Sequence, residues 1–110
     1  MEIKRETAPG AVVYRISGDI NAATGPNLDS ALAASESSSR LIMDMRDVAY
    51  VSSAGLRVIV QAAKRAKAAK GGVAIFGLRP LVQEVFDLSG LGTVIPIASD
   101  EAGARAKLGM

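Results

Sequence analysis

The chain has 110 residues, of which 49% are hydrophobic and 22% are charged, and it contains neither cysteine nor histidine. This composition fits a folded chain with its own core, and the lack of cysteine excludes a disulfide framework and suits a reducing cytoplasm. The net charge of +2 and the aromatic content of 4% argue against direct nucleic-acid binding. No apolar run approaches the roughly 20 residues needed for membrane insertion, so we expect a cytoplasmic protein.

The missing histidine also bears on catalysis. Histidine is the commonest general base and the commonest metal ligand, and cysteine is absent as well. We therefore expect no enzyme, no metal site and no cofactor. The chain has no internal repeat and no long linker, which predicts a single domain over residues 1–110.

The first elements are two predicted strands, residues 3–8 and 11–17, joined by a turn at Pro9 and Gly10. Residues 18–21 break the alternation of the second strand.

A helix is predicted next. Pro26 suits a first helical position, after Thr24 or a glycine as the cap. The buried stripe of this helix is predicted to consist of Leu28, Ala31 and Leu32. This stripe ends at Ser35, and residues 36–39 are predicted to form a polar loop.

The central stretch begins with a buried strand, residues 41–45, in which Asp44 is the one charge. Two serines then stand directly before a long helical pattern, so Ser52 or Ser53 lies in its N-cap region. They either cap the helix and do nothing else, or also hold a phosphate at a helix end that favours anions. The apolar face of this helix is predicted to comprise Leu56, Ile59, Val60 and Ala63.

Cations close this helix, and the glycine pair 71–72 is expected to supply its left-handed stop. These cations could also form a patch for an acidic partner, although a helix face exposed to solvent explains the same residues. The cations are Lys64, Arg65, Lys67 and Lys70.

The rest of the chain alternates strands and helices. Residues 73–76 form a strand, Pro80 opens a helix, and Gly90 ends that helix. Residues 93–97 are predicted to be a final strand at a sheet edge, where Pro96 is tolerated. Asp100 caps a terminal helix whose apolar part comprises Ala102, Ala106 and Leu108. This order predicts an α/β fold, with a mixed β-sheet of four to five strands and helices packed mainly on one face.

Residues 51–55 match the hydrolase nucleophile elbow, Gly-x-Ser-x-Gly, at every fixed position except the first, where Val51 replaces glycine. A hydrolase serine needs a base, and the lysines that follow lie at the far end of the helix or beyond it. We therefore do not favour a hydrolase.

The sequence DVAYVSSAGL at residues 47–56 resembles the signature of STAS domains, specifically of bacterial anti-sigma factor antagonists. Residues 18–21 with Thr24 resemble the loop before the first helix of that family. Residues 86–91 resemble its motif after the third strand-helix unit. The resemblance extends over nearly the whole chain and implies a sheet with helices on one side and a regulatory role.

The resemblance implies that phosphorylation controls which proteins are bound to one another. Members of this family bind an anti-sigma factor that is also a serine kinase, which frees the sigma factor. The kinase phosphorylates the antagonist on a serine at the start of the central helix and ends the interaction, and a metal-dependent serine phosphatase reverses this. By similarity the phosphoacceptor is Ser53. The implied partner-binding residues are Asp19, Asn21, Thr24, Ser52, Ser53, Ala54, Gly55, Leu56 and Arg57.

The chain departs from the family pattern at two positions. Ser52 stands where many members have aspartate, and Asn21 replaces a common acidic residue, although Asp19 lies nearby. Ser52 is therefore a rival phosphoacceptor. The alternative function is a STAS scaffold that is never phosphorylated and serves in a lipid-transport or stressosome-like assembly. A small-molecule or nucleotide sensor has no support in the sequence beyond the anion-favouring helix end.

Overall fold

The computed structural model describes residues 1–34 and 40–110 and contains five strands and four α-helices. The predicted loop at 36–39, and Ser35 as the end of the first stripe, lie outside the described residues. In chain order the elements are β1 (Glu2–Ala8), β2 (Ala11–Ser17), α1 (Gly25–Ala33), β3 (Arg40–Asp47), α2 (Ser53–Ala68), β4 (Gly72–Phe76), α3 (Pro80–Ser89), a 3-10 turn at Leu91–Thr93, β5 (Ile97–Ala98) and α4 (Glu101–Lys107).

The strands form one mixed sheet in the order β1-β2-β3-β4-β5. β1 is antiparallel to β2, whereas the other neighbouring strands are parallel, and Met43 pairs with both Tyr14 and Ile75 across the centre. Helices are needed to connect parallel neighbours, which is why the chain alternates strand and helix after β2. The predicted α/β class and mixed sheet are confirmed.

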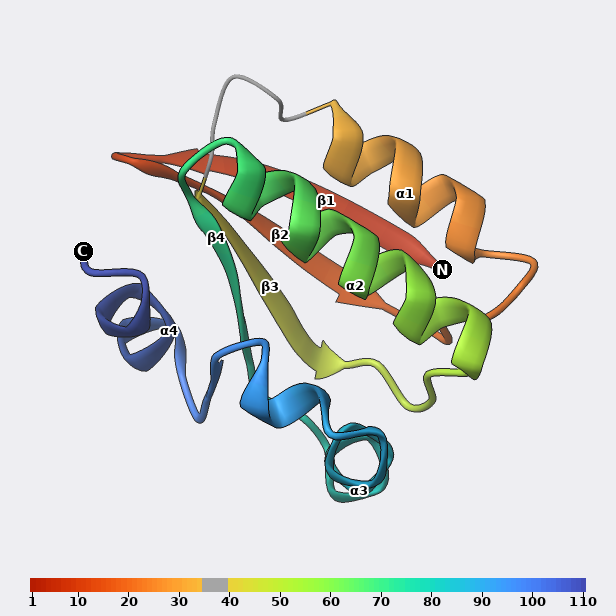
Figure 1. Ribbon diagram of the computed structural model, residues 1–110. Coiled ribbons are helices and arrows are strands. Elements are labelled where there is room, and N and C mark those ends of the chain that lie inside the picture. The colour runs from red at the N-terminus through yellow and green to blue at the C-terminus, as the bar shows by residue number, and fades with distance from the viewer. Residues whose placement is uncertain (35–39) are drawn as a thin grey trace.

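The two faces of the sheet are covered unequally (Figure 1). α1 and α2 lie side by side over one face, and α3 adds Val82 and Phe86 to the same core. That core also holds alternate residues of the central strands, such as Tyr14, Met43 and Ile75, because successive side chains point to opposite faces. α4 covers part of the other face through Ala104. The expectation that the helices pack mainly on one face is therefore confirmed.

The buried line of α2 differs from the predicted one. Its buried residues are Gly55, Ile59, Ala62 and Ala66, whereas Leu56, Val60 and Ala63 are only half-buried. Small residues on the inner line let α2 lie close to the sheet and to α1, so the larger apolar residues flank the contact. Hydrophobic periodicity predicted the helix correctly, but it assigned the bulkier side chains to the buried face in place of the small residues.

α2 also ends differently from the prediction, because Lys70 and not a glycine has the left-handed conformation, with φ of 65°. The N–H of Gly71 donates to Ala66 O at 2.8 Å, which is the long bond of a Schellman motif. Lys70 thus occupies the position that glycine usually fills.

The predicted strand at 93–97 is wrong in its bounds, since β5 comprises only Ile97–Ala98. The chain after Gly90 continues in local turns, with Thr93 N and Thr93 Oγ1 both donating to Gly90 O. β5 does lie at an edge of the sheet, as expected.

The apolar part of α4 was predicted only in part: Leu108 is half-buried and packs against the core as expected, but Ala104 is the buried alanine, whereas Ala102 and Ala106 are exposed. Asp100 caps α4 as predicted, and an ion pair from Glu101 to Arg15 of β2 helps fix how the helix is rotated.

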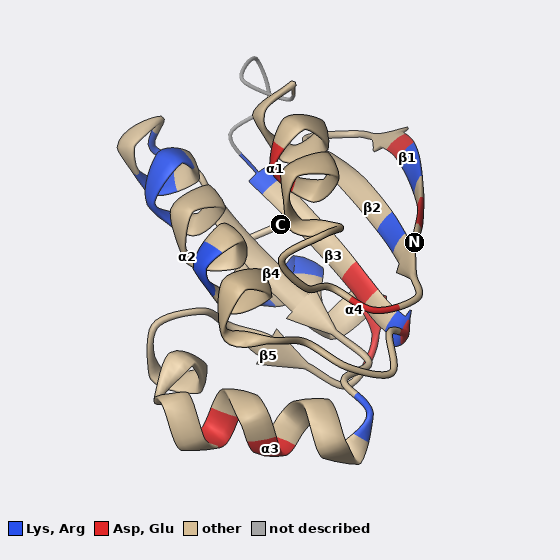
Figure 2. Ribbon diagram, turned by 90° about the vertical axis from the view of Figure 1, so that its right-hand side faces the viewer, with Lys and Arg blue, Asp and Glu red and all other residues tan. Residues whose placement is uncertain are grey.

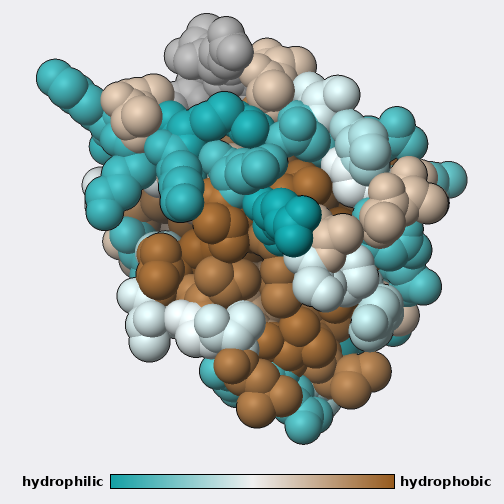
Figure 3. All heavy atoms as spheres, turned by 45° about the vertical axis from the view of Figure 1, so that its right-hand side comes forward, coloured by the Kyte–Doolittle hydropathy of each residue, from teal (hydrophilic) through white to brown (hydrophobic). Residues whose placement is uncertain are grey.

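Hydrophobic side chains remain on the surface near α3. Figure 3 shows a hydrophobic area on the lower half of the molecule, bordered above by hydrophilic residues. Large side chains exposed on α3 and just after it are Leu81, Leu88 and Val94. Within the described residues, no helix is both long and apolar enough to span a bilayer.

Candidate functional site

The candidate site is the junction between β3 and α2. After β3 the chain buries Val48 and Val51, and Val51 forms a parallel bridge with Ile20. The backbone N–H of Ile20 donates to Tyr50 O at 3.0 Å, and that of Ser52 donates to Ile20 O at 2.9 Å. The loop that follows β2 is thereby fixed beside the N-terminus of α2, which brings two distant parts of the sequence together.

The two serines have different environments. Ser52 is the N-cap of α2 in an extended conformation, and its half-buried hydroxyl oxygen accepts from Gly55 N at 3.2 Å. Ser53 is the first helical residue and is exposed, and its hydroxyl has no hydrogen bond to any described residue. The prediction that the serines lie in the N-cap region is confirmed, and the cap itself is Ser52.

Gly55 sets how closely the loop after β2 approaches α2. An ideal Cβ at this position would lie 2.6 Å from Ile20 O and 2.8 Å from Ile20 Cγ2. Any side chain would therefore push the two segments apart. This explains physically why a glycine stands two residues after Ser53.

The polar residues of the loop after β2 are largely occupied by bonds within the loop. Thr24 Oγ1 donates to Asp19 O at 2.8 Å and accepts from Asn21 N at 2.9 Å. Asn21 Oδ1 in turn accepts from the N–H groups of Ala23 and Thr24. Thr24 is at the N-cap position of α1, but its side chain makes no capping bond, so it supports the loop instead.

The remaining predicted site residues lie around this junction and differ in how exposed they are. Asp19 and Arg57 are exposed, Ala54 is half-buried, and Leu56 packs partly against the core. Ile20 and Tyr50 belong to the same junction, because their backbone groups join its two segments, and they are absent from the predicted site. Ile20 is the single large apolar residue in a polar loop, which is a signal for a buried anchor.

Charge is distributed unequally along α2. Figure 2 shows basic residues concentrated at the end of this helix that is farther from Ser53. At the N-terminus the helix dipole and unpaired backbone N–H groups favour an anion. Within the described residues no group of three or more acidic side chains is placed to hold a metal ion.

A second polar cluster, centred on the buried Asp44, lies on the sheet face that carries α4. Asp44 Oδ2 accepts from Arg46 at 2.8 Å and from Arg15 at 3.1 Å, and Asp44 Oδ1 accepts from Arg46 N. Burial alone would raise the pKa of Asp44, but the hydrogen bonds from Arg46 and Arg15 together hold this pKa below its ordinary value. Arg15 also pairs with Glu6 and Glu101.

The STAS domain family model matches residues 2–104. The chain is 32% identical over 108 residues to a Bordetella bronchiseptica protein named "Putative anti-sigma factor antagonist BtrV", an alignment covering 96% of this chain and 93% of that protein. The chain therefore belongs to the STAS domain family.

Solved structures agree on the fold. A crystal structure of a Thermotoga maritima protein named "a putative anti-sigma factor antagonist" superposes with a TM-score of 0.91 at 16% identity, over 98% of this chain and 95% of that one. SpoIIAA, named an anti-sigma factor antagonist, superposes in its unphosphorylated form with a TM-score of 0.82 at 18% identity, over 99% and 98% of the two chains. A structure of the phosphorylated form from Bacillus has a TM-score of 0.72 at 18% identity, over 92% and 95%.

Proposed function

We propose that this protein is an anti-sigma factor antagonist and not an enzyme, and that Ser53 is its phosphorylation site. The observation that carries the assignment is the contrast between the two serines: Ser52 Oγ is engaged as a helix cap, whereas Ser53 is exposed at the first helical position. The 32% identity to the Bordetella bronchiseptica relative supports the antagonist role. The phosphorylated form of SpoIIAA supports a phosphate cycle in a protein of this fold.

The partner is an anti-sigma factor that is also a serine kinase, and binding to it frees the sigma factor. The docking surface is the junction of the loop after β2 with the N-terminus of α2, including Asp19 and Arg57. Because Asn21 and Thr24 are held by bonds within the loop, they shape this surface. The kinase transfers a phosphoryl group from ATP to Ser53 Oγ, and a metal-dependent serine phosphatase later removes it.

The phosphate acts at the surface and leaves the fold intact. It adds roughly 1.5 to 2 negative charges and three acceptor oxygens at a helix N-terminus. There the helix dipole favours an anion by about 0.3–1 kcal/mol, so the modified protein stays folded. Converting a mostly bound partner to a mostly free one requires about 5.5 kcal/mol of difference in binding. A dianion forced out of water without a partner at a closely packed interface supplies a cost of that size.

Phosphopeptide mapping after incubation with the partner kinase and ATP tests the site. We expect phosphate on Ser53, and none on the Ser53→Ala variant. Phosphate found on Ser52 or Ser30 in place of Ser53 would overturn the assignment. If no kinase modifies the chain and it co-purifies with a transporter ATPase, the alternative of an unphosphorylated scaffold holds instead.

A further inference from the structure

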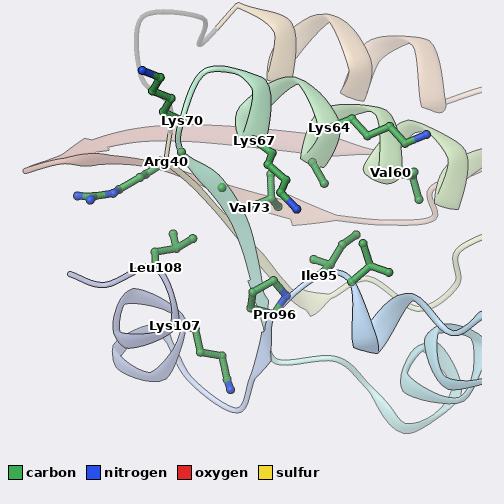
Figure 4. A pocket seen from close by; sticks show the side chains of 14 residues that line it. Arg40, Val60, Lys64, Lys67, Lys70, Val73, Ile95, Pro96, Lys107 and Leu108 are labelled. Carbon is green, nitrogen blue, oxygen red and sulfur yellow. The ribbon is translucent and has the colours of Figure 1, made fainter.

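A second candidate site lies at the other end of α2, where a hollow of about 540 Å³ opens between α2, the start of β4, the segment before β5 and the end of α4 (Figure 4). Val73 and Ile95 are almost completely buried at its wall, whereas Val94, at 71% exposed, stands at its rim. Its volume is within the range of small-molecule sites, roughly 300–1,000 Å³. The aliphatic lining consists chiefly of Val60, Ala63, Val73, Ile95, Pro96 and Leu108.

Every charged residue that lines this hollow is a cation. The five are Arg40, Lys64, Lys67, Lys70 and Lys107, and none forms an ion pair with a described residue. Figure 4 shows Lys67 reaching from α2 over the hollow, while Arg40 and Lys70 point outward at one end. The flexible four-carbon stem of lysine lets such an ammonium follow an anion at the mouth.

We propose that this hollow binds a fatty carboxylate, with its chain against the aliphatic wall and its carboxylate at Lys67 and Lys64. Two observations select this chemistry: the wall is aliphatic, and the rim carries positive charge alone. The lining residues that the structure describes include no aromatic ring that could stack on a nucleotide base. They also include no side-chain amide or carboxylate that could form hydrogen bonds with the edge of that base. A nucleotide therefore fits the hollow less well than a single-chain anionic amphiphile.

The site is independent of the proposed phosphate switch. Lys67 follows Ser53 by 14 positions in the same helix, which separates them by about 21 Å along the axis. A ligand in the hollow does not cover Ser53, so the two sites can be tested separately.

The direct test is titration of the whole chain with dodecanoate, below the concentration at which it forms micelles, followed by calorimetry. We expect saturable binding of one molecule per chain, and at least tenfold weaker binding of dodecanol, which has the same chain without the charge. Lys67→Glu should weaken dodecanoate binding at least tenfold, whereas the same charge change at Lys4, an exposed residue of β1, should leave it unchanged. Equal loss in both variants, or equal binding of dodecanoate and dodecanol, would overturn the proposal.

A second variant guards against an effect of Lys67→Glu on folding. Val94→Glu places a carboxylate at an exposed position on the rim, where the fold is not expected to change, and should also weaken dodecanoate binding at least tenfold. In NMR spectra of the wild type, the methyl signals of Val60, Val73 and Ile95 should shift with dodecanoate. Shifts confined to Leu81 and Leu88 on α3, or binding to anionic vesicles or an acidic peptide without binding of free dodecanoate, would contradict the assignment.

Discussion

The N-terminal turn of α2 and the cluster around Asp44 show two ways of placing polar groups next to a hydrophobic core, one on each face of the sheet. At the helix the groups are neutral and are satisfied locally, with Ser52 Oγ accepting from Gly55 N and Asn21 and Thr24 bonded within their loop. Around Asp44 the groups are charged and compensate one another across four elements, β1, β2, β3 and α4. The difference indicates where a new charge has an effect. The charges of the Asp44 cluster already compensate one another, whereas Ser53 is a neutral and exposed hydroxyl, so a phosphate there adds a charge that the fold does not already contain.

The largest expected loss of stability comes from removing the close approach at the helix. Gly55→Ala places a Cβ 2.6 Å from Ile20 O, so the two segments must separate. We expect the free energy of unfolding in urea to fall by about 2–3 kcal/mol, which is typical of overpacking.

Gly72→Ala is the matched control, because its Cβ would meet the end of the half-buried Leu108 side chain at 3.1 Å and that side chain can move. We expect a change within about 0.5 kcal/mol there. Similar losses in both variants would mean that the contact of Gly55 with Ile20 is not a special constraint.

The next effect tests the charged region. Asp44→Asn removes the carboxylate that accepts from Arg15 and Arg46, and we expect a loss of about 2 kcal/mol at pH 7, since both arginines can partly rehydrate. Because the pKa of Asp44 is lowered in the folded state, its contribution is complete above the unfolded pKa of about 3.9 and disappears as the pH falls through the folded value. Urea unfolding at several pH values should show wild type and variant converging below about pH 4.

Asp47→Asn provides the comparison on the same strand, because that carboxylate is 78% exposed and lies 3.9 Å from Arg79. Its stability should stay within about 0.5 kcal/mol of wild type at pH 7. If Asp47→Asn changed the pH dependence of stability as much as Asp44→Asn does, this dependence would come from surface charge in general and not from the Asp44 cluster.

A smaller effect separates the two serines. Ser52→Ala removes the cap of α2 and should lower the free energy of unfolding by about 1 kcal/mol. Ser53→Ala removes an exposed hydroxyl and should change it by less than about 0.5 kcal/mol. Thermal and urea unfolding of both variants measure this difference, and the reverse order of losses would assign the cap to Ser53.

The smallest expected effect concerns added charge. Ser53→Asp should raise the free energy of unfolding by about 0.3–1 kcal/mol at low salt, because an anion is favoured at a helix N-terminus. Ser53→Lys should lower it slightly, and the difference between the two should shrink as salt is added. A clear loss of stability with aspartate would show that this helix end does not tolerate the charge that a phosphate brings.

Sequence patterns could predict the features of this fold that depend on neighbouring residues. Pro26 and Pro80 near the starts of α1 and α3, Gly90 at the end of α3, and the serine pair at the start of α2 all follow from local chemistry. The packing of the helices mainly on one face of the sheet was also predicted correctly, but some details of how the elements pack together were not. Periodicity favours bulky side chains, so the small residues on the inner line of α2 were missed. The buried position of Ala104 depends on how α4 packs against β4 and β5, which the sequence of the helix alone does not contain.

The candidate site also combines features that the sequence could predict with features that it could not. Ser52 and Ser53 could be located from the sequence alone, but their different roles depend on which hydroxyl meets Gly55 N. The anchoring of Ile20 beside Val51 depends on bonds between loops about thirty residues apart, which no local pattern contains.

Release of the partner kinase by ATP tests the central claim most directly. The wild type, Ser52→Ala and Ser53→Ala are each bound to the immobilised anti-sigma factor kinase, and the fraction released after ATP is added is measured. The proposed switch predicts that the wild type and Ser52→Ala are released while Ser53→Ala stays bound. Release of Ser53→Ala at the wild-type rate would contradict the claim that a phosphate on this hydroxyl ends the interaction.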